Sequence, residues 1–181
     1  MDRLVLGIKA IDKVNEGVGK TVAWLTLATV LVCGGVVALR YAAGVGYVWM
    51  QELYVWMHAA VFMLCAGYAF LRNAHVRVDI FYAAASARTK AWIDLFGVIF
   101  LLFPWLALIV WAGWDYVAYS WAIREISVQN NGMVGVFVLK SAIIGFAVLL
   151  GLQGLAWIGR CILVIRGREP PPAEGLSGPT G

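Results

Sequence analysis

The chain alternates long apolar runs with short charged segments, and this pattern predicts its architecture. Four runs have room for a membrane-spanning helix, at about residues 21–39, 47–71, 91–117 and 135–159. An α-helix rises about 1.5 Å per residue, so a run of about 19 residues covers roughly 28 Å, close to the hydrocarbon thickness of a bilayer. We therefore expect an all-α integral membrane fold, with four transmembrane helices in one domain at residues 21–165.

The two ends of the chain differ from the spans. In residues 1–20, Leu4, Ile8 and Ile11 recur at helical spacing among charged residues. This spacing predicts an amphipathic N-terminal helix that lies along the bilayer interface, and a frayed polar leader is the alternative. Residues 166–181 contain three consecutive prolines and no apolar period, so we expect a disordered tail.

Two features interrupt the apolar pattern in the second half of the chain. Asp79, in the polar connection 72–90, can cap a short cytoplasmic helix between spans two and three, because its carboxylate accepts hydrogen bonds from backbone N–H groups. In the third span, Pro104 lacks a backbone N–H, and its ring clashes with the carbonyl of Phe100. We therefore expect a kink in the middle of this span.

Composition supports the membrane interpretation and excludes other classes. The residues are 62% hydrophobic and 13% charged, and the mean hydropathy is +0.83, which exceeds what a soluble protein of 181 residues can bury. The net charge of +4 is no indication of nucleic-acid binding, because the basic residues cluster at the edges of the spans. Cys33, Cys65 and Cys161 show no CxxC spacing and are expected to be small buried hydrophobic residues.

The distribution of basic residues predicts the orientation. Eleven of the 14 Lys and Arg residues fall in the N-terminal segment, the 72–90 connection and the C-terminal segment, and the other three are Arg40, Arg124 and Lys140. By the positive-inside rule, both termini are expected in the cytoplasm. Arg40, Glu52, Arg124, Glu125 and Lys140 then gather at the opposite face, with Arg40 and Glu52 as a candidate ion pair. Lys140 and Arg160 are expected to extend toward opposite membrane surfaces.

The sequence contains little that indicates catalysis. It has no GxSxG, no HExxH and no phosphate-binding glycine loop with its lysine. Its two histidines, His58 inside the second span and His75 after it, do not form a transmembrane pair for haem. A lone histidine such as His58 is more often a hydrogen-bonded packing residue. We therefore expect no catalytic residue, no metal ligand and no cofactor, and the protein is not expected to be an enzyme.

Several short segments at the edges of the spans carry a resemblance to a known family. They are Arg40-Tyr41, Gln51-Glu52-Leu53, His75-Val76-Arg77-Val78-Asp79, Ser120-Trp121, Arg124-Glu125, Leu139-Lys140-Ser141 and Leu152-Gln153-Gly154. Over about residues 8–165, the chain resembles the small, four-helix (DctQ-type) membrane subunit of tripartite ATP-independent periplasmic (TRAP) transporters, in the branch labelled mannitol/chloroaromatic.

The resemblance implies a function that the residues alone do not. In this family the small subunit partners a large permease subunit in the bacterial inner membrane. The large subunit carries the sodium and substrate sites and moves as an elevator, while a periplasmic solute-binding protein delivers the solute, usually an organic acid. The chain is then expected to be a scaffold that anchors the large subunit, with uptake driven by an ion gradient.

The candidate site residues are therefore interface or structural residues. Arg40 and Glu52 are expected to fix spans one and two, and Arg124, Glu125 and Lys140 to meet the large subunit or the solute-binding protein. The cytoplasmic turn is expected to be set by His75, Arg77 and Asp79. For each of these residues, simple anchoring at the membrane edge is the alternative.

Two other classes of protein remain as alternatives. The chain has the size of an autonomous proton-coupled transporter that acts as a homodimer and uses Glu52 as its carboxylate. The long 72–90 and 118–133 connections, and the position of Glu52 near a helix end, argue against that interpretation. A redox membrane enzyme is the third class, and the chain lacks the ligands and paired cysteines that it needs.

Overall fold

The fold consists of helices that form two long antiparallel pairs. The computed structural model describes residues 2–75, 82 and 84–170. In chain order the elements are α1 (Asp2–Ala43), α2 (Val48–Leu64), α3 (Ala66–Leu71), α4 (Ala87–Gly97), the π-helix η1 (Val98–Leu102), α5 (Phe103–Ala122) and α6 (Val136–Ile165). Four continuous helical stretches are long and apolar enough to cross a membrane: Arg3–Ala43, Val48–Leu71, Ala87–Ala122 and Val136–Ile165. This confirms the predicted all-α fold with four spanning helices.

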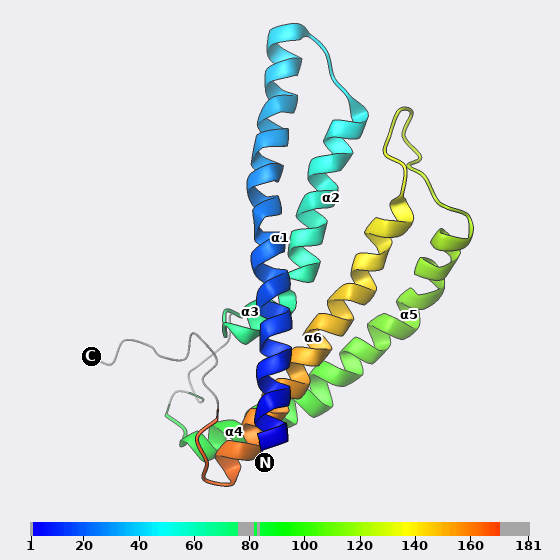
Figure 1. The fold of residues 1–181 in the computed structure, drawn as a ribbon. Helices are drawn as coiled ribbons and strands as arrows, with labels where there is room; N and C mark the ends of the chain where they lie inside the picture. The colour runs from blue at the N-terminus through cyan, green and yellow to red at the C-terminus, as the bar shows by residue number, and fades with distance from the viewer. Residues whose placement is uncertain (1, 76–81, 83, 171–181) are drawn as a thin grey trace.

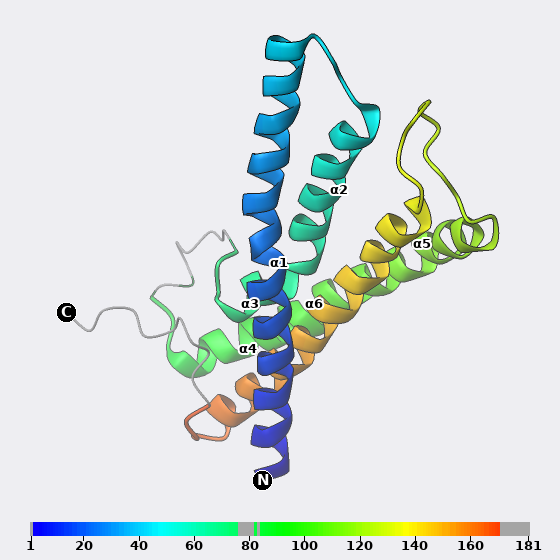
Figure 2. The same cartoon turned by 45° about the horizontal axis from the view of Figure 1, so that its top comes forward.

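Helix α6 is the centre of the bundle. It packs against α1, α2, α3, α4, η1 and α5, whereas α1 packs mainly on α2. Figures 1 and 2 show that the α1–α2 pair and the α5–α6 pair are close together near the N-terminus and diverge away from it. We call the end near the N-terminus the terminal end, and the end that holds the α1–α2 and α5–α6 connections the loop end.

The first helix corrects the expected boundary at residue 20. A single helix of 42 residues runs from Asp2 to Ala43, about 63 Å at the usual rise of an α-helix, and it appears straight in Figure 1. Residues 2–20 are helical, as expected, but they continue into the first span without a break instead of forming a separate helix. The reason is tertiary: Ile8 is buried with Ala156 and Leu163 of α6, so the polar-apolar pattern of this segment faces another helix.

The third span begins at a serine cap. Ser86 accepts a hydrogen bond from the backbone N–H of Thr89 (3.2 Å) and caps α4, which continues directly into η1 and α5. The described part of the predicted short helix is therefore the beginning of this span. Arg77 and Asp79 lie outside the described residues.

A π-helical turn accommodates the proline in the third span. The N–H of Phe103 donates to the carbonyl oxygen of Val98, five residues earlier, and Pro104 follows at once. A π-turn adds a residue to the helical turn, which separates the proline ring from the carbonyls before it. The distortion expected at Pro104 thus takes the form of a π-helix at residues 98–102.

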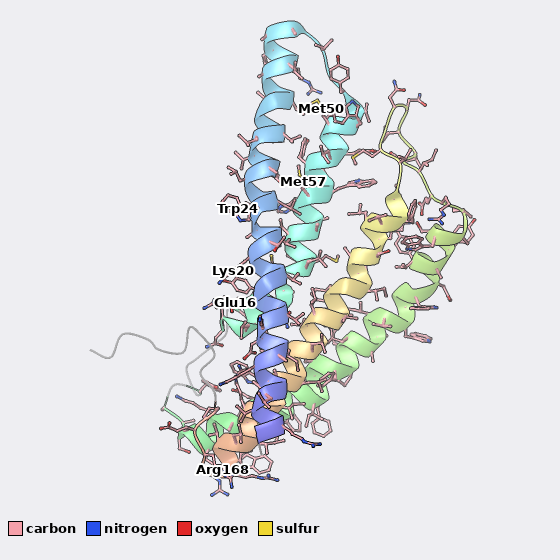
Figure 3. All side chains as sticks on the ribbon, in the orientation of Figure 1. Glu16, Lys20, Trp24, Met50, Met57 and Arg168 are labelled. Carbon is pink, nitrogen blue, oxygen red and sulfur yellow. The ribbon has the colours of Figure 1, made fainter. Side chains whose placement is uncertain are left out.

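The packed core lies toward the terminal end. Ala91, Val98, Trp157 and Cys161 form one buried cluster, and Phe70 stacks on Trp157 with ring centroids 5.2 Å apart. A further cluster of Leu106, Ala147 and Leu150 lies nearer the middle of the bundle. On the loop-end half of α1, large apolar side chains such as Trp24 (71% exposed, labelled in Figure 3) and Leu31 (67% exposed) face outward. These side chains suit a lipid environment.

Close packing between α1 and α3 depends on a glycine. A Cβ atom added at Gly67 would lie 2.1 Å from Oδ1 of Asn15 and 2.9 Å from the carbonyl oxygen of Leu149. Gly67→Ala is therefore expected to lower the melting temperature of the purified protein, with an overpacking cost of about 1–3 kcal/mol. Gly17→Ala is the control, because a Cβ there meets nothing within 4 Å, and it should melt at or slightly above the wild-type temperature. Equal melting of the wild type and Gly67→Ala would contradict the tight contact.

Candidate functional site

Polar side chains join the helices at both ends of the bundle. At the loop end, the contacts centre on Glu52 of α2 and on the segment between α5 and α6, residues 123–135, which we call the α5–α6 loop. At the terminal end, Asp12, Asn15, Gln153 and Arg160 connect α1 to α6, and we call them the α1–α6 cluster. The two groups are the candidate functional sites of the chain.

Glu52 holds the α5–α6 loop against α2. Its carboxylate accepts hydrogen bonds from Oγ of Ser127 and from the backbone N–H of Met133 (2.6 Å). The loop contains a short antiparallel bridge between Ile126 and Val134, which brings Ser127 and Met133 to the same carboxylate. Because Glu52 belongs to one helical pair and the loop to the other, this contact links the two pairs where they diverge.

The turn of the α5–α6 loop fits closely around Glu52. Asn131 adopts a positive φ of 60°, as the Asn-Asn-Gly sequence allows. A Cβ added at Gly132 would lie 2.5 Å from Oγ of Ser127 and 2.8 Å from Oε2 of Glu52. A glycine is therefore needed at this position for the loop to reach the carboxylate.

A second ion pair closes the base of the loop. Nζ of Lys140 on α6 pairs with Oε2 of Glu125, and the two side chains are 12% and 26% exposed. Lys140 also lies 3.8 Å from the ring centroid of Tyr116 on α5. The hydrogen bond from Lys140 lowers the pKa of Glu125 from its ordinary value. Lys140 is thus engaged in the protein instead of extending freely to the membrane surface.

The loop-end residues only partly follow the sequence-based expectation. Glu52, Glu125 and Lys140 do gather there, and the guanidinium of Arg124 lies 5.3 Å from the ring centroids of Trp121 and Phe137. The candidate pair of Arg40 with Glu52 is wrong: within the described part of the chain no ion pair joins them, and Arg40 is exposed. The carboxylate is instead engaged by two donors of the α5–α6 loop, Oγ of Ser127 and the N–H of Met133.

The α1–α6 cluster is almost completely buried. Asn15 is 1% exposed, Gln153 0% and Arg160 4%. The Nδ2 of Asn15 donates to Oε1 of Gln153 (2.9 Å), and Nε2 of Gln153 donates to Oδ1 of Asp12 (3.1 Å). Arg160 forms an ion pair with Asp12. The expectation that Arg160 extends to the membrane surface is therefore wrong, because Asp12 supplies a partner inside the bundle.

Neighbouring contacts at the terminal end extend this cluster. Glu16 pairs with Arg72 after α3 (3.1 Å) and with Lys20 one turn further along α1 (2.5 Å), and Glu16 and Lys20 are labelled on α1 in Figure 3. Asp94 of α4 accepts hydrogen bonds from Oη of Tyr82 (2.8 Å) and Nε1 of Trp157 (3.4 Å). Polar contacts at the terminal end thus connect α1 with α6, α4 with α6, and α1 with Arg72.

Sequence reasoning missed most of the terminal-end residues. A signal was present: Asp12, Asn15 and Glu16 have the i, i+3, i+4 spacing of one helix face, and Gln153 and Arg160 are two helical turns apart. The partner of each face is decided by helix packing, which the spacing does not reveal. Of the candidates in the cytoplasmic turn, only His75 is described; it is exposed and contacts the Phe70 ring edge-to-face, with centroids 5.9 Å apart.

The comparisons with known proteins give one match. The model of the family described as the DctQ component of tripartite ATP-independent periplasmic transporters matches residues 28–164, well over half of the chain. No curated protein and no solved structure matches the chain. The matched region contains Glu52, the α5–α6 loop and the α6 half of the α1–α6 cluster.

Breaking the buried ion pair should be costly, whereas replacing both partners should not. Arg160→Met leaves Asp12 without its ion-pair partner and is expected to destabilise the protein by about 3–5 kcal/mol. The double variant Asp12→Leu, Arg160→Met should recover much of this loss, because an apolar pair carries no desolvation cost. Thermal unfolding of the three proteins in one detergent tests this, and a double variant no more stable than Arg160→Met would contradict it.

The Glu125–Lys140 pair should make stability depend on pH. Since the folded state lowers the pKa of Glu125, the pair stabilises the fold above the ordinary glutamate pKa of about 4.3, and this contribution is lost as the pH falls through the lowered value. The difference in melting temperature between wild type and Glu125→Gln should therefore be largest near pH 7 and shrink in acid. A difference that stays constant from neutral to acidic pH would exclude this role.

Proposed function

This protein belongs to the DctQ component family of tripartite ATP-independent periplasmic transporters, and we propose that its role is to brace the large permease subunit in the bilayer. As a DctQ component, it is the small membrane subunit of the transporter. The family works with a large membrane subunit, DctM, and a periplasmic solute-binding protein, DctP. A component of this kind is a transport subunit of the inner membrane.

The observation that carries the proposal is the combination of the family match with polar contacts at both ends of the bundle. Glu52 connects the two helical pairs at the loop end, and Asp12 and Arg160 connect them at the terminal end. A polar side chain among apolar helices is costly without a partner. Each of these contacts therefore opposes sliding or rotation of one helix against the other, because such a movement would separate the partners. A stiff bundle of this kind suits a subunit against which a larger protein moves.

We assign the transport steps themselves to the partner proteins. Sodium coupling, the elevator movement and recognition of an organic acid would belong to the large subunit and the solute-binding protein. Eleven of the 14 Lys and Arg residues belong to the N-terminal segment, the 72–90 connection and the C-terminal segment, so these segments and both chain termini would face the cytoplasm. His75, Arg77 and Asp79 would shape the cytoplasmic turn.

In this proposal the loop end faces the periplasm and contacts the partners. Glu52 acts indirectly, because its carboxylate shapes the α5–α6 loop. Arg40 is exposed, and Arg124, Glu125 and Lys140 lie at the base of the loop. These side chains would meet the large subunit or the docked solute-binding protein.

Glu52→Ala should reduce recovery of the complex. When the variant is co-expressed with the large subunit and purified by a tag on that subunit, we expect several-fold less of it than of wild type, with reduced solute uptake. Glu52→Gln should retain most of the recovery, because an amide oxygen can still accept from the N–H of Met133. His58→Ala, at an exposed position of α2, is the control. The melting temperature of each variant alone separates loss of docking from loss of folding.

Two outcomes would contradict the proposal. Unchanged complex yield and uptake with Glu52→Ala would exclude the loop-shaping role of this carboxylate. Solute flux in liposomes that contain this chain alone would instead support the alternative, an autonomous four-helix transporter that acts as a homodimer and moves protons through Glu52. The same Glu52 variants in those liposomes would then be expected to lose flux.

A further inference from the structure

An open groove lies on α6 between two of the elements that pack on it. Helix α3 on one side and the continuous helix α4–η1–α5 on the other both pack on α6. The space between them is an open cavity of about 520 Å³. We call it the lateral groove, and its apolar lining includes Phe70, Val98, Leu102, Trp105, Phe146 and Leu150.

The lateral groove is polar at one end only. Asn73, His75 and Asp94 line it at the terminal end, and the lining from there to Trp105 is apolar apart from the Trp157 N–H. Asp94 and Trp105 are 11 residues apart on one helical stretch, which corresponds to about 16 Å. The groove therefore has the shape and polarity of a site for an amphiphile with one apolar chain along the helices.

A second cavity continues the groove at its polar end. This cavity, of about 280 Å³, shares Asn73, Asp94 and Trp157 with the groove and is also lined by Lys90 and Arg160. The Asp94 carboxylate already accepts from Tyr82 and Trp157, and Arg160 is paired with Asp12. Lys90, whose Nζ lies 5.4 Å from the Tyr82 ring centroid, is the second cationic side chain that lines this cavity.

We propose that the lateral groove binds a phospholipid of the surrounding bilayer, with one acyl chain in the groove and the phosphate in the second cavity near Lys90. Bilayer lipid is the solvent of this surface, and an apolar cavity does not hold ordered water. The volume lies in the range of small-ligand sites, about 300–1,000 Å³. Basic pockets between transmembrane helices are a known way of binding anionic headgroups.

The size of the groove favours an acyl chain over a helix of another subunit. A helix has a diameter of about 10–12 Å with its side chains, so a segment 16 Å long occupies roughly 1,300–1,800 Å³. The groove holds about 520 Å³. A lipid would place its polar part beside Asn73, His75 and Asp94 and its apolar chain along the rest of the lining.

Gly97 allows a direct test, because it lines the groove and a Cβ there meets nothing within 4 Å. Gly97→Phe should fill the groove without disturbing the helix packing, and Gly97→Leu is a smaller second variant. Gly17→Phe is the matched control on α1, where a Cβ also meets nothing within 4 Å and which does not line the lateral groove. Melting temperatures establish that each variant is folded.

Native mass spectrometry of the full chain, purified in a mild detergent, gives the readout. The wild type and Gly17→Phe should retain a phospholipid through purification, and both Gly97 variants should lose it several-fold. In mixed micelles with phosphatidylglycerol, Lys90→Gln should bind this lipid several-fold more weakly than wild type. Equal retention by wild type and the Gly97 variants would overturn the proposal. A wild type without bound lipid, combined with loss of the large subunit from Gly97→Phe, would show that a partner protein occupies the groove.

Discussion

The cost of placing a polar side chain among apolar helices governs this structure. A charged or amide group in such a place is tolerated only when it finds a partner, because neither lipid nor apolar side chains can replace water. Asp12 and Arg160 form an ion pair across α1 and α6, Gln153 donates a hydrogen bond to Asp12, and Asn15 donates one to Gln153. The helices that carry these groups are therefore held in one register, and the packed core of the bundle forms around them.

At the loop end the same constraint has a different form. The backbone N–H of Met133 needs a hydrogen-bond acceptor, and the carboxylate of Glu52 provides it. Glu125 and Lys140 close the base of the same loop. The two helical pairs diverge toward the loop end. Among the described elements, α6 contacts each of the others. Polar contacts at the ends and apolar contacts along α6 together explain how so thin a bundle keeps its shape, which is the property that a bracing subunit needs.

The sequence predicted the number of spanning helices, because a helix that crosses lipid must satisfy its own backbone and expose apolar side chains. It also indicated the loop-end site, since Glu52, Glu125 and Lys140 are charged residues at the edges of spans. The sequence did not reveal which face of one helix packs on which face of another. Arg160 has the sequence context of a membrane-edge cation, yet it is 4% exposed. Residues 2–20 have the pattern of an interfacial helix, yet Ile8 is buried against α6, with Val5 and Ile11 packed beside it.

What the sequence determined by itself was therefore the class of the protein: four apolar helices, charged connections and a resemblance to a transporter subunit. These follow from properties of single segments, such as length, hydropathy and local spacing. Only the tertiary structure decided that Glu52 binds the α5–α6 loop instead of Arg40, that Asp12 meets Arg160, and that a groove remains between α3 and the third span. Each of these depends on which helix faces are adjacent, and adjacency is a property of the packed bundle that no single segment contains.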